Sequence, residues 1–182
     1  MKVEVTDLPG VLLISPKVFD DERGWFLETW RSERYAHHGV GPSFVQANAS
    51  RSGRGVLRGL HYQWPEPQGK LVWVSEGCVL DVAVDIRPDS PHFRRWMAME
   101  LDAQDHRQLW IPEGFAHGFQ VLSEQATFHY LCTRPYRAEF DSAIAWNDPE
   151  IGVDWALPPV GLSAKDAAAP SLAELALGRL PE

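Results

Sequence analysis

Three side chains with complementary chemistry lie close together near the middle of the chain. Arg58, His61 and Lys70 belong to the stretch Arg58-Gly59-Leu60-His61-Tyr62-Gln63 and to the stretch Gln68-Gly69-Lys70-Leu71-Val72 that follows it. An arginine can bind a phosphate or carboxylate through paired hydrogen bonds, and a histidine titrates near neutral pH, so it can accept or donate a proton. A lysine can stabilise an oxyanion that develops during a reaction. Together the three favour an enzyme that abstracts a proton next to a carbonyl group of an anionic substrate.

A second histidine follows a proline–glycine turn. Residues 112–117 read Pro-Glu-Gly-Phe-Ala-His, which resembles the second motif of cupins, small jelly-roll barrels in which this histidine points into the barrel. The alternative for His117 is a turn residue with a structural hydrogen bond. The first cupin motif normally supplies a His-x-His pair and a glutamate to a metal, whereas this chain has His61 alone at that place. Because a transition metal needs three or four suitable ligands, we expect a pocket without a metal.

Short, closely spaced strands are predicted to position these groups. Apolar, β-branched and aromatic runs are separated by Gly, Pro, Asp and Asn, and the expected strands are residues 11–15, 25–30, 44–49, 56–63, 71–76, 78–86, 96–101, 108–111, 118–122, 127–133 and 143–146. Helices are expected only at residues 32–38, with Ser32 as the cap and Gly39 as the stop, and at residues 171–177. With almost no helix between the strands, the pattern predicts an all-β sandwich, jelly roll or closed barrel.

Composition narrows the class of protein. The chain has 182 residues, of which 45% are hydrophobic and 23% charged, so we expect one domain over residues 1–182. A formal net charge of −8 disfavours a nucleic-acid surface. No signal-peptide pattern and no apolar run of membrane-spanning length are found, so we expect a cytoplasmic protein that does not bind membranes. Cys78 and Cys132 lie singly in apolar segments, which favours buried thiols over a disulfide.

Several motifs resemble, in order, those of one enzyme family. The matching segments are residues 19–28, 44–50, 55–63, 68–72, 81–87, 111–119, 146–149 and 162–166. Over about residues 10–170 the chain resembles dTDP-4-dehydrorhamnose 3,5-epimerases. The resemblance implies a cupin-type jelly roll, a double-stranded β-helix barrel with short terminal helices.

The resemblance also implies a reaction. The family's substrate is dTDP-4-keto-6-deoxy-D-glucose, in which C3 and C5 both flank the C4 ketone. Removal of either hydrogen gives an enolate with its charge on O4, and a base on one face and a proton donor on the other then invert each carbon. The product would be dTDP-4-keto-L-rhamnose, an intermediate of dTDP-L-rhamnose biosynthesis. No cofactor is required, in agreement with the absence of a Gly-rich nucleotide loop.

Four catalytic roles follow from the family motifs. His61 would be the base, oriented by Asp166, which would accept the proton of its other ring nitrogen. Lys70 would stabilise the enolate, and Tyr130 would be the acid on the opposite face. Each has a plainer alternative: Asp166 lies in a Ser-x-x-Asp segment that is equally typical of a helix cap, Lys70 could be a solvated lysine at a strand end, and Tyr130 could serve packing alone.

Further residues are expected to bind the substrate: Arg23, Phe26, Glu28, Gln46, Asn48, Arg58, His117, Tyr136 and Lys165. Arg58 would hold the pyrophosphate. In this family the N-terminal segment that contains Arg23, Phe26 and Glu28 crosses into the partner subunit, which implies a homodimer. The C-terminal tail begins near residue 167, and the motifs assign it no role.

Three functions remain in competition. The leading one is the 3,5-epimerase. The second is a single-site 3- or 5-epimerase of a related dTDP-4-keto-deoxysugar, because Ala47 and Leu131 replace an aspartate and a lysine that are common in the family, and this leaves substrate preference open. The third is a sugar-nucleotide-binding cupin without activity, which would not need the four catalytic groups. Deuterium exchange at C3 and C5 distinguishes all three.

Overall fold

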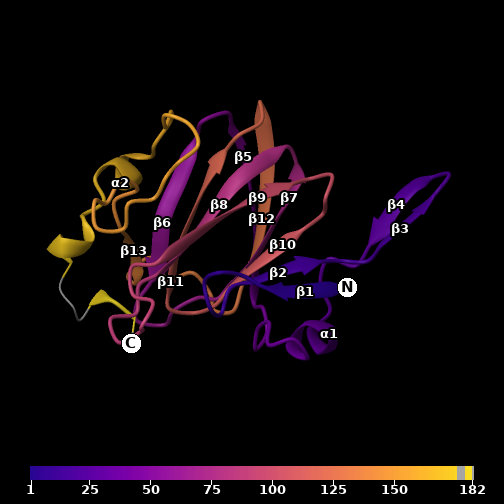
Figure 1. The fold of residues 1–182 in the computed structure, drawn as a ribbon, viewed down its shortest axis with the longest axis horizontal. Coiled ribbons are helices and arrows are strands. Elements are labelled where there is room, and N and C mark those ends of the chain that lie inside the picture. The colour runs from indigo at the N-terminus through magenta and orange to yellow at the C-terminus, as the bar shows by residue number, and fades with distance from the viewer. Residues whose placement is uncertain (176–178, 182) are drawn as a thin grey trace.

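Two antiparallel β-sheets face each other in the computed structural model, which describes residues 1–175 and 179–181 (Figure 1). The six-stranded sheet has the order β1 (Lys2–Val5), β2 (Leu12–Ser15), β10 (Gln108–Ile111), β7 (Lys70–Glu76), β12 (Gln125–Cys132) and β5 (Gln46–Gly53). The five-stranded sheet has the order β13 (Asp141–Ala143), β6 (Leu57–Gln63), β11 (Phe115–Val121), β8 (Cys78–Asp85) and β9 (Trp96–Asp102). Many neighbours within each sheet are distant in sequence, as in a jelly roll.

The remaining elements lie outside these two sheets. Strands β3 (Val18–Asp21) and β4 (Gly24–Leu27) form a separate hairpin that projects from the body of the molecule (Figure 1). The helices of the described residues are short: α1 (Ser32–Ala36), α2 (Ala164–Ala167) and the 3₁₀-helix η1 (Leu172–Glu174). None of the described helices is long and apolar enough to cross a membrane.

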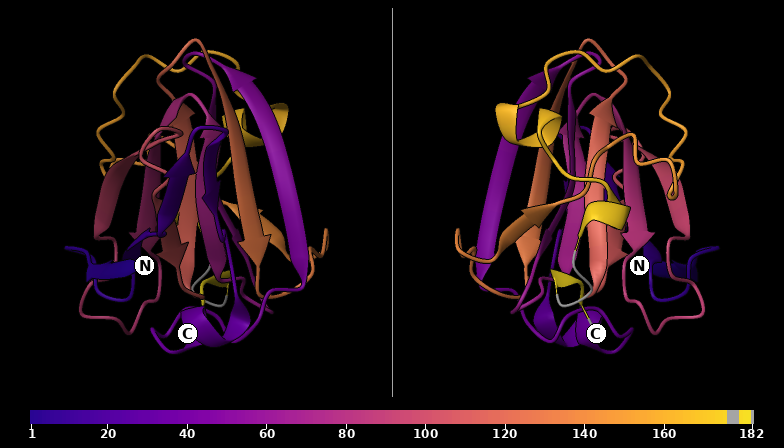
Figure 2. Two further views of the ribbon diagram at one scale, coloured as in Figure 1. Left: turned by 90° about the vertical axis from the view of Figure 1, so that its right-hand side faces the viewer. Right: turned by 90° about the vertical axis from the view of Figure 1, so that its left-hand side faces the viewer.

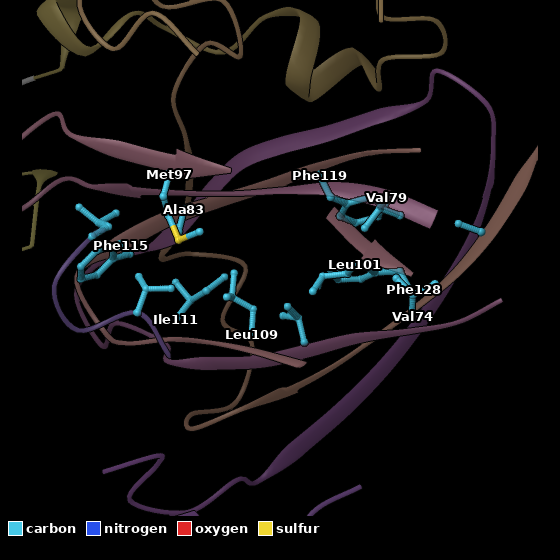
Figure 3. Packing of buried hydrophobic residues seen from close by; sticks show 14 of the residues in the cluster. Val74, Val79, Ala83, Met97, Leu101, Leu109, Ile111, Phe115, Phe119 and Phe128 are labelled. Atoms are coloured by element: carbon cyan, nitrogen blue, oxygen red, sulfur yellow. The ribbon is translucent and has the colours of Figure 1, made fainter. Parts of the chain in front are cut away.

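The main core fills the space between the sheets. Because side chains alternate along a strand, every second residue points inward, and these residues are apolar over most of the barrel. The core residues that Figure 3 labels are Val74, Val79, Ala83, Met97, Leu101, Leu109, Ile111, Phe115, Phe119 and Phe128. Burial of each large apolar side chain contributes about 1.5–3 kcal/mol, so this layer holds the two sheets in register around the polar cavity described below.

The outer face of the five-stranded sheet is covered by the C-terminal part of the chain. Figure 2 (right) shows this segment, in yellow, lying across the sheet. Leu60, Val82 and Ala116 of the sheet belong to one buried cluster with Ile151 and Leu172 of the C-terminal segment. The covering segment carries α2, and α2 carries Asp166.

The structure confirms the predicted all-β jelly roll and most of its strands, with corrections at the ends of the chain. The strand expected at 25–30 ends at Leu27, and the one expected at 143–146 lies instead at Asp141–Ala143. Strands β1 and β3 and helix α2 were not predicted. The cap of α1 is Arg31 and not Ser32, which is already helical. The helix expected at 171–177 is a 3₁₀-turn at Leu172–Glu174, and its last two expected residues lie outside the described part.

Candidate active site

A polar cavity opens between the two sheets. It has a volume of about 330 Å³ and is lined by Gln46, Asn48, His61, Tyr62, Gln63, Gln68, Lys70, Tyr130, Cys132, Tyr136 and Asp141. A second, smaller cavity of about 160 Å³ shares His61, Lys70 and Tyr130 with it and adds Ser50, Arg58, His117, Phe119 and Phe128. Eight of the residues predicted from the sequence therefore meet in one place: Gln46, Asn48, Arg58, His61, Lys70, His117, Tyr130 and Tyr136.

The strand pairing places the two histidines on one wall and the tyrosine on the opposite wall. His61 on β6 and His117 on β11 are paired neighbours in the five-stranded sheet. Tyr130 and Lys70 come from β12 and β7 of the six-stranded sheet, where Tyr130 is opposite Asn48 and Lys70 is opposite Cys132. A ligand between the sheets would therefore have an imidazole on one side and a phenol on the other.

His61 is bonded to a carboxylate that is far away in sequence. Its Nε2 atom lies 2.5 Å from Oδ1 of Asp166, which is only 3% exposed. Because an ionised carboxylate can only accept hydrogen bonds, Nε2 is the nitrogen that carries the proton. The other ring nitrogen, Nδ1, makes no hydrogen bond within the described part of the chain and is the one available as a base.

The Asp166 carboxylate is held in the ionised form by its neighbours. Burial alone would raise its pKa, but hydrogen bonds from His61 and Ser163 and the nearby Lys165 charge outweigh burial and lower the pKa. Ser163 donates from its hydroxyl to Oδ2 of Asp166 (2.8 Å) and accepts from the Asp166 backbone N–H (3.0 Å). In the Ser-x-x-Asp segment Ser163 therefore caps α2, while the Asp166 side chain bonds His61.

Lys70 lines both cavities and has no bonded counter-ion among the described residues. No hydrogen bond or ion pair to its ammonium group is found among the described residues. Burial lowers its pKa, and the nearby Cys132, Asp141 and Asp81 oppose this effect only in part. An anionic group that enters the cavity would therefore be attracted to Lys70 and would favour its charged form.

Tyr130 lies on the opposite wall as a protonated phenol. Burial raises its pKa above the ordinary value, and nearby Cys132 adds to this effect. The ring packs near Phe128, at 6.2 Å between ring centroids. Its hydroxyl makes no hydrogen bond to any described residue, so the phenol proton is available to a ligand.

His117 has a buried acidic partner that the sequence argument did not assign. Its Nε2 donates to Oδ2 of Asp81 (2.9 Å), and Asp81 is fully buried. Burial lowers the pKa of His117, although Asp81 opposes the shift. The sequence feature that could have revealed Asp81 is an acidic residue at an inward position of an otherwise apolar strand.

The rim of the cavity contains a second group of polar residues. Tyr136 donates from its hydroxyl to Oδ2 of Asp141 (3.0 Å), and Lys165 forms an ion pair with the same carboxylate. Gln46 accepts from the backbone N–H of Tyr136 (2.7 Å) and so ties the 134–140 loop to β5. Asp141 was not predicted, because it lies in a stretch without a periodic pattern. Gln63, Gln68 and Cys132 were likewise missed as cavity residues.

The guanidinium group of Arg58 is oriented by a neutral hydroxyl group and can still bind an anion. Its Nε and Nη2 atoms donate to Oγ of Ser52 at 3.2 and 3.1 Å. A hydroxyl leaves the guanidinium charge uncompensated, so Arg58 keeps its capacity to bind a phosphate.

Four predicted binding residues do not line this cavity. Lys165 reaches only its rim, through the ion pair with Asp141. Arg23 and Phe26 lie on the projecting β3–β4 hairpin, where Phe26 is 69% exposed. Glu28 forms ion pairs with Arg31 and Arg34 beside α1. Within this single chain, the hairpin contributes nothing to the cavity walls.

No described group of three or more His, Cys, Asp or Glu side chains has the arrangement of a metal site. His61 and His117 each use Nε2 for an aspartate. The side chains of Lys70 and Arg58, which line the two cavities, suit an anionic organic ligand.

Comparison with known proteins identifies the family. Residues 5–174 match the family model of dTDP-4-dehydrorhamnose 3,5-epimerase. The chain is 51% identical over 175 residues to the dTDP-4-dehydrorhamnose 3,5-epimerase of Salmonella typhimurium, an alignment that covers 94% of this chain and 96% of the other.

Solved structures similar to this chain are also sugar-nucleotide epimerases. A dTDP-6-deoxy-D-glucose-3,5-epimerase from Legionella pneumophila, in complex with dTDP-4-keto-L-rhamnose, superposes with a TM-score of 0.96 at 48% identity and covers 99% of this chain and 97% of its own. A 3′-monoepimerase from Streptomyces bikiniensis in complex with dTDP-quinovose is more distant, with a TM-score of 0.86 at 33% identity, covering 92% and 86%. The chain belongs to the dTDP-4-dehydrorhamnose 3,5-epimerase family.

Proposed function

We propose that this protein is a dTDP-4-dehydrorhamnose 3,5-epimerase, an isomerase that converts dTDP-4-keto-6-deoxy-D-glucose to dTDP-4-keto-L-rhamnose in dTDP-L-rhamnose biosynthesis. The observation that carries the proposal is that His61, bonded to Asp166, lies on one wall of the cavity and Tyr130 lies on the other. Inversion at a carbon needs a base and an acid on opposite faces, and this arrangement supplies both. Epimerase relatives at about half identity over nearly the whole chain support the same reaction.

In this mechanism Nδ1 of His61 removes the proton from C3 or C5. Asp166 keeps the proton of His61 on Nε2 and stabilises the imidazolium that forms. The electron pair of the broken C–H bond moves onto O4, where the charge of Lys70 stabilises the enolate. Tyr130 then donates its phenol proton to the carbon from the other face. No cofactor takes part.

The remaining cavity residues would bind the nucleotide. Arg58 would hold the pyrophosphate, with His117, Gln46 and Asn48 contacting the sugar or nucleotide, and Tyr136 and Lys165 at the rim. The basic side chains of Arg58 and Lys70 line the two cavities of a protein with a net charge of −8, so they can attract an anionic ligand locally.

We also propose a homodimer in which the β3–β4 hairpin completes the nucleotide site of a second copy. Phe19, Trp25 and Phe26 are all more than half exposed on the hairpin, which projects from the body (Figure 1). Exposed aromatic groups of this kind are typical of an interface. Arg23, Phe26 and Glu28 would then bind the substrate of the partner. The free thiols of Cys78 and Cys132 fit a reducing compartment, the cytoplasm.

The test uses dTDP-4-keto-6-deoxy-D-glucose in heavy water with proton NMR. A 3,5-epimerase incorporates deuterium at both C3 and C5 and yields the L-rhamno product. Deuterium at one carbon only would identify a single-site epimerase, the activity named for the Streptomyces bikiniensis relative. If neither carbon exchanges although dTDP binds, the protein is a sugar-nucleotide-binding cupin. His61→Gln serves as the control for non-enzymatic exchange.

A further inference from the structure

Asp166 lies in a short segment whose own helix is too short to be stable without support from the rest of the fold. Helix α2 has four residues, which is a single turn, and isolated short helices are not stable in water. The segment lies on the outer face of the five-stranded sheet, whereas His61 points to the inner cavity from strand β6. The position of the carboxylate therefore depends on whatever fixes the backbone on either side of α2.

Two buried polar side chains fix that backbone. The first is Gln120, on the outer side of β11 and fully buried. Its Nε2 donates to the carbonyl oxygen of Leu157 (2.8 Å), and its Oε1 accepts from the N–H of Leu157 (3.0 Å). One side chain thus pairs with both backbone groups of a residue that precedes Asp166 by nine positions.

The second is Asp148, which is 2% exposed. Its Oδ1 accepts from the N–H groups of Glu150 and Ile151 at 2.9 and 3.0 Å, which closes a local turn. Its Oδ2 accepts from the N–H of Leu172 at 2.6 Å, six positions after Asp166. A buried carboxylate that binds three backbone N–H groups is a strong and specific attachment.

Backbone hydrogen bonds support both attachments. Val160 donates to the carbonyl of Gly55 (2.9 Å), and Ala145 donates to the carbonyl of Pro170 (2.8 Å). Gln120 and Asp148 thus attach the backbone on the two sides of α2 through side chains that are 0% and 2% exposed. Neither side chain lines the cavity.

We propose that Gln120 and Asp148 are positioning residues that set the orientation of His61 by holding Asp166 from both sides. This inference rests on the proposed function only for its activity readout. Since a displacement of about 1 Å at a catalytic group can cost about 100-fold in rate, loss of either attachment lowers turnover without removing any group that touches the substrate.

The variant Asp148→Asn is the sharpest test. An asparagine can keep its oxygen on Glu150 and Ile151, but it presents an amide NH₂ to the N–H of Leu172, so it releases the 170–172 backbone selectively. We expect kcat to fall at least about tenfold, with the affinity for dTDP within about twofold of wild type. Gln120→Met, which keeps the volume and removes both hydrogen bonds to Leu157, should act in the same direction. Asp154→Asn is the matched control, because Asp154 is exposed in the same loop and makes no hydrogen bond to any described residue.

A double-mutant cycle separates positioning from general destabilisation. If Asp148 acts through Asp166, then Asp148→Asn in the Asp166→Asn background should lower kcat less than about threefold further. The proposal would be overturned if Asp148→Asn lowered kcat by the same factor in the wild-type protein and in the Asp166→Asn protein. It would also be overturned if Asp148→Asn had the kcat of the wild type.

A second readout needs no activity. The Nε2 proton of His61, shared with a carboxylate, should give a low-field imidazole N–H resonance in the unliganded protein, assigned by its loss in His61→Gln, while the His117–Asp81 pair provides an internal reference. We expect the His61 signal to be lost or exchange-broadened in Asp166→Asn and in Asp148→Asn and kept in Asp154→Asn. An unchanged signal in Asp148→Asn refutes the positioning role. A signal that depends on Asp148 in a protein that exchanges neither C3 nor C5 would sustain the positioning role and reject the proposed reaction.

Discussion

The substitution Asp166→Asn tests the proposed base most directly. In the structure, Ser163 donates to Oδ2 of Asp166 while Nε2 of His61 donates to Oδ1. An asparagine that keeps its oxygen on the Ser163 hydroxyl must turn its NH₂ group toward His61. His61 can then only accept at Nε2, so its proton moves to Nδ1, the nitrogen that should act as the base.

The expected decrease in kcat for Asp166→Asn follows from these contacts. A hydrogen bond to a charged group is worth about 1.5–3 kcal/mol, and about 1.4 kcal/mol corresponds to a tenfold change in rate. Loss of the carboxylate charge alone therefore predicts a decrease of about 10- to 100-fold in kcat. The reversed tautomer adds to this, and we expect a total of about 100- to 1,000-fold. Binding of dTDP should be unchanged, because Asp166 does not line the cavity.

The assay is the rate of deuterium incorporation at C3 and C5, with dTDP affinity measured separately. Ser163→Ala is the control: it removes the helix cap, at a cost of about 1 kcal/mol in the free energy of unfolding, but keeps the carboxylate on His61. It should lower kcat less than about tenfold. If Asp166→Asn turns over at the wild-type rate, the aspartate is only part of a helix cap and the reasoning fails.

Three further outcomes are expected. Tyr130→Phe should keep exchange from the His61 side but form at least about 100-fold less inverted product, and inversion at the wild-type rate would make Tyr136 or a bound water the acid. Activity should survive exhaustive chelation, and loss with EDTA that a divalent ion restores would contradict the metal-free mechanism. Burial lowers the pKa of His117 from its ordinary 6.5, so the unfolded chain binds this proton first and stability falls as pH drops below about 6.5. The decrease in melting temperature between pH 7.5 and 5.5 should be smaller in His117→Asn, and an equal decrease would show that His117 does not contribute.

The strands of the barrel could be predicted from local patterns, and the elements at the chain ends could not. Strands such as Leu57–Gln63 and Cys78–Asp85 are apolar runs bounded by turn residues, so alternation and β-propensity suffice to find them. Helix α2 has one turn and forms because the sheet beneath it and the attachments at Leu157 and Leu172 hold it. Such an element has no periodic signal for a sequence pattern to reveal.

The residue types in the candidate site were evident in the sequence, but their mutual geometry was not. His61, Lys70 and Arg58 are close in sequence, and their chemistry alone pointed to an anionic, enolisable substrate. The partner of His117, the buried Asp81, became clear only when the inner face of β8 was known to meet β11. Asp141 joined the site because β13 pairs with β6, a contact between segments about 80 residues apart.

The sequence by itself determined which groups are available and, through the order of its motifs, the family. Only the tertiary structure decided that His61 and Tyr130 face each other from different sheets, that Nε2 of His61 is the nitrogen bound to Asp166, and that Gln120 and Asp148 hold the segment carrying Asp166. The physical reason is that residue chemistry and strand propensity are local, whereas sheet pairing brings together residues as far apart as Leu12 and Trp110, and the His61–Asp166 bond spans 105 positions. Those long-range pairings depend on burying the apolar faces of strands that are far apart in the chain, which no local stretch of sequence encodes.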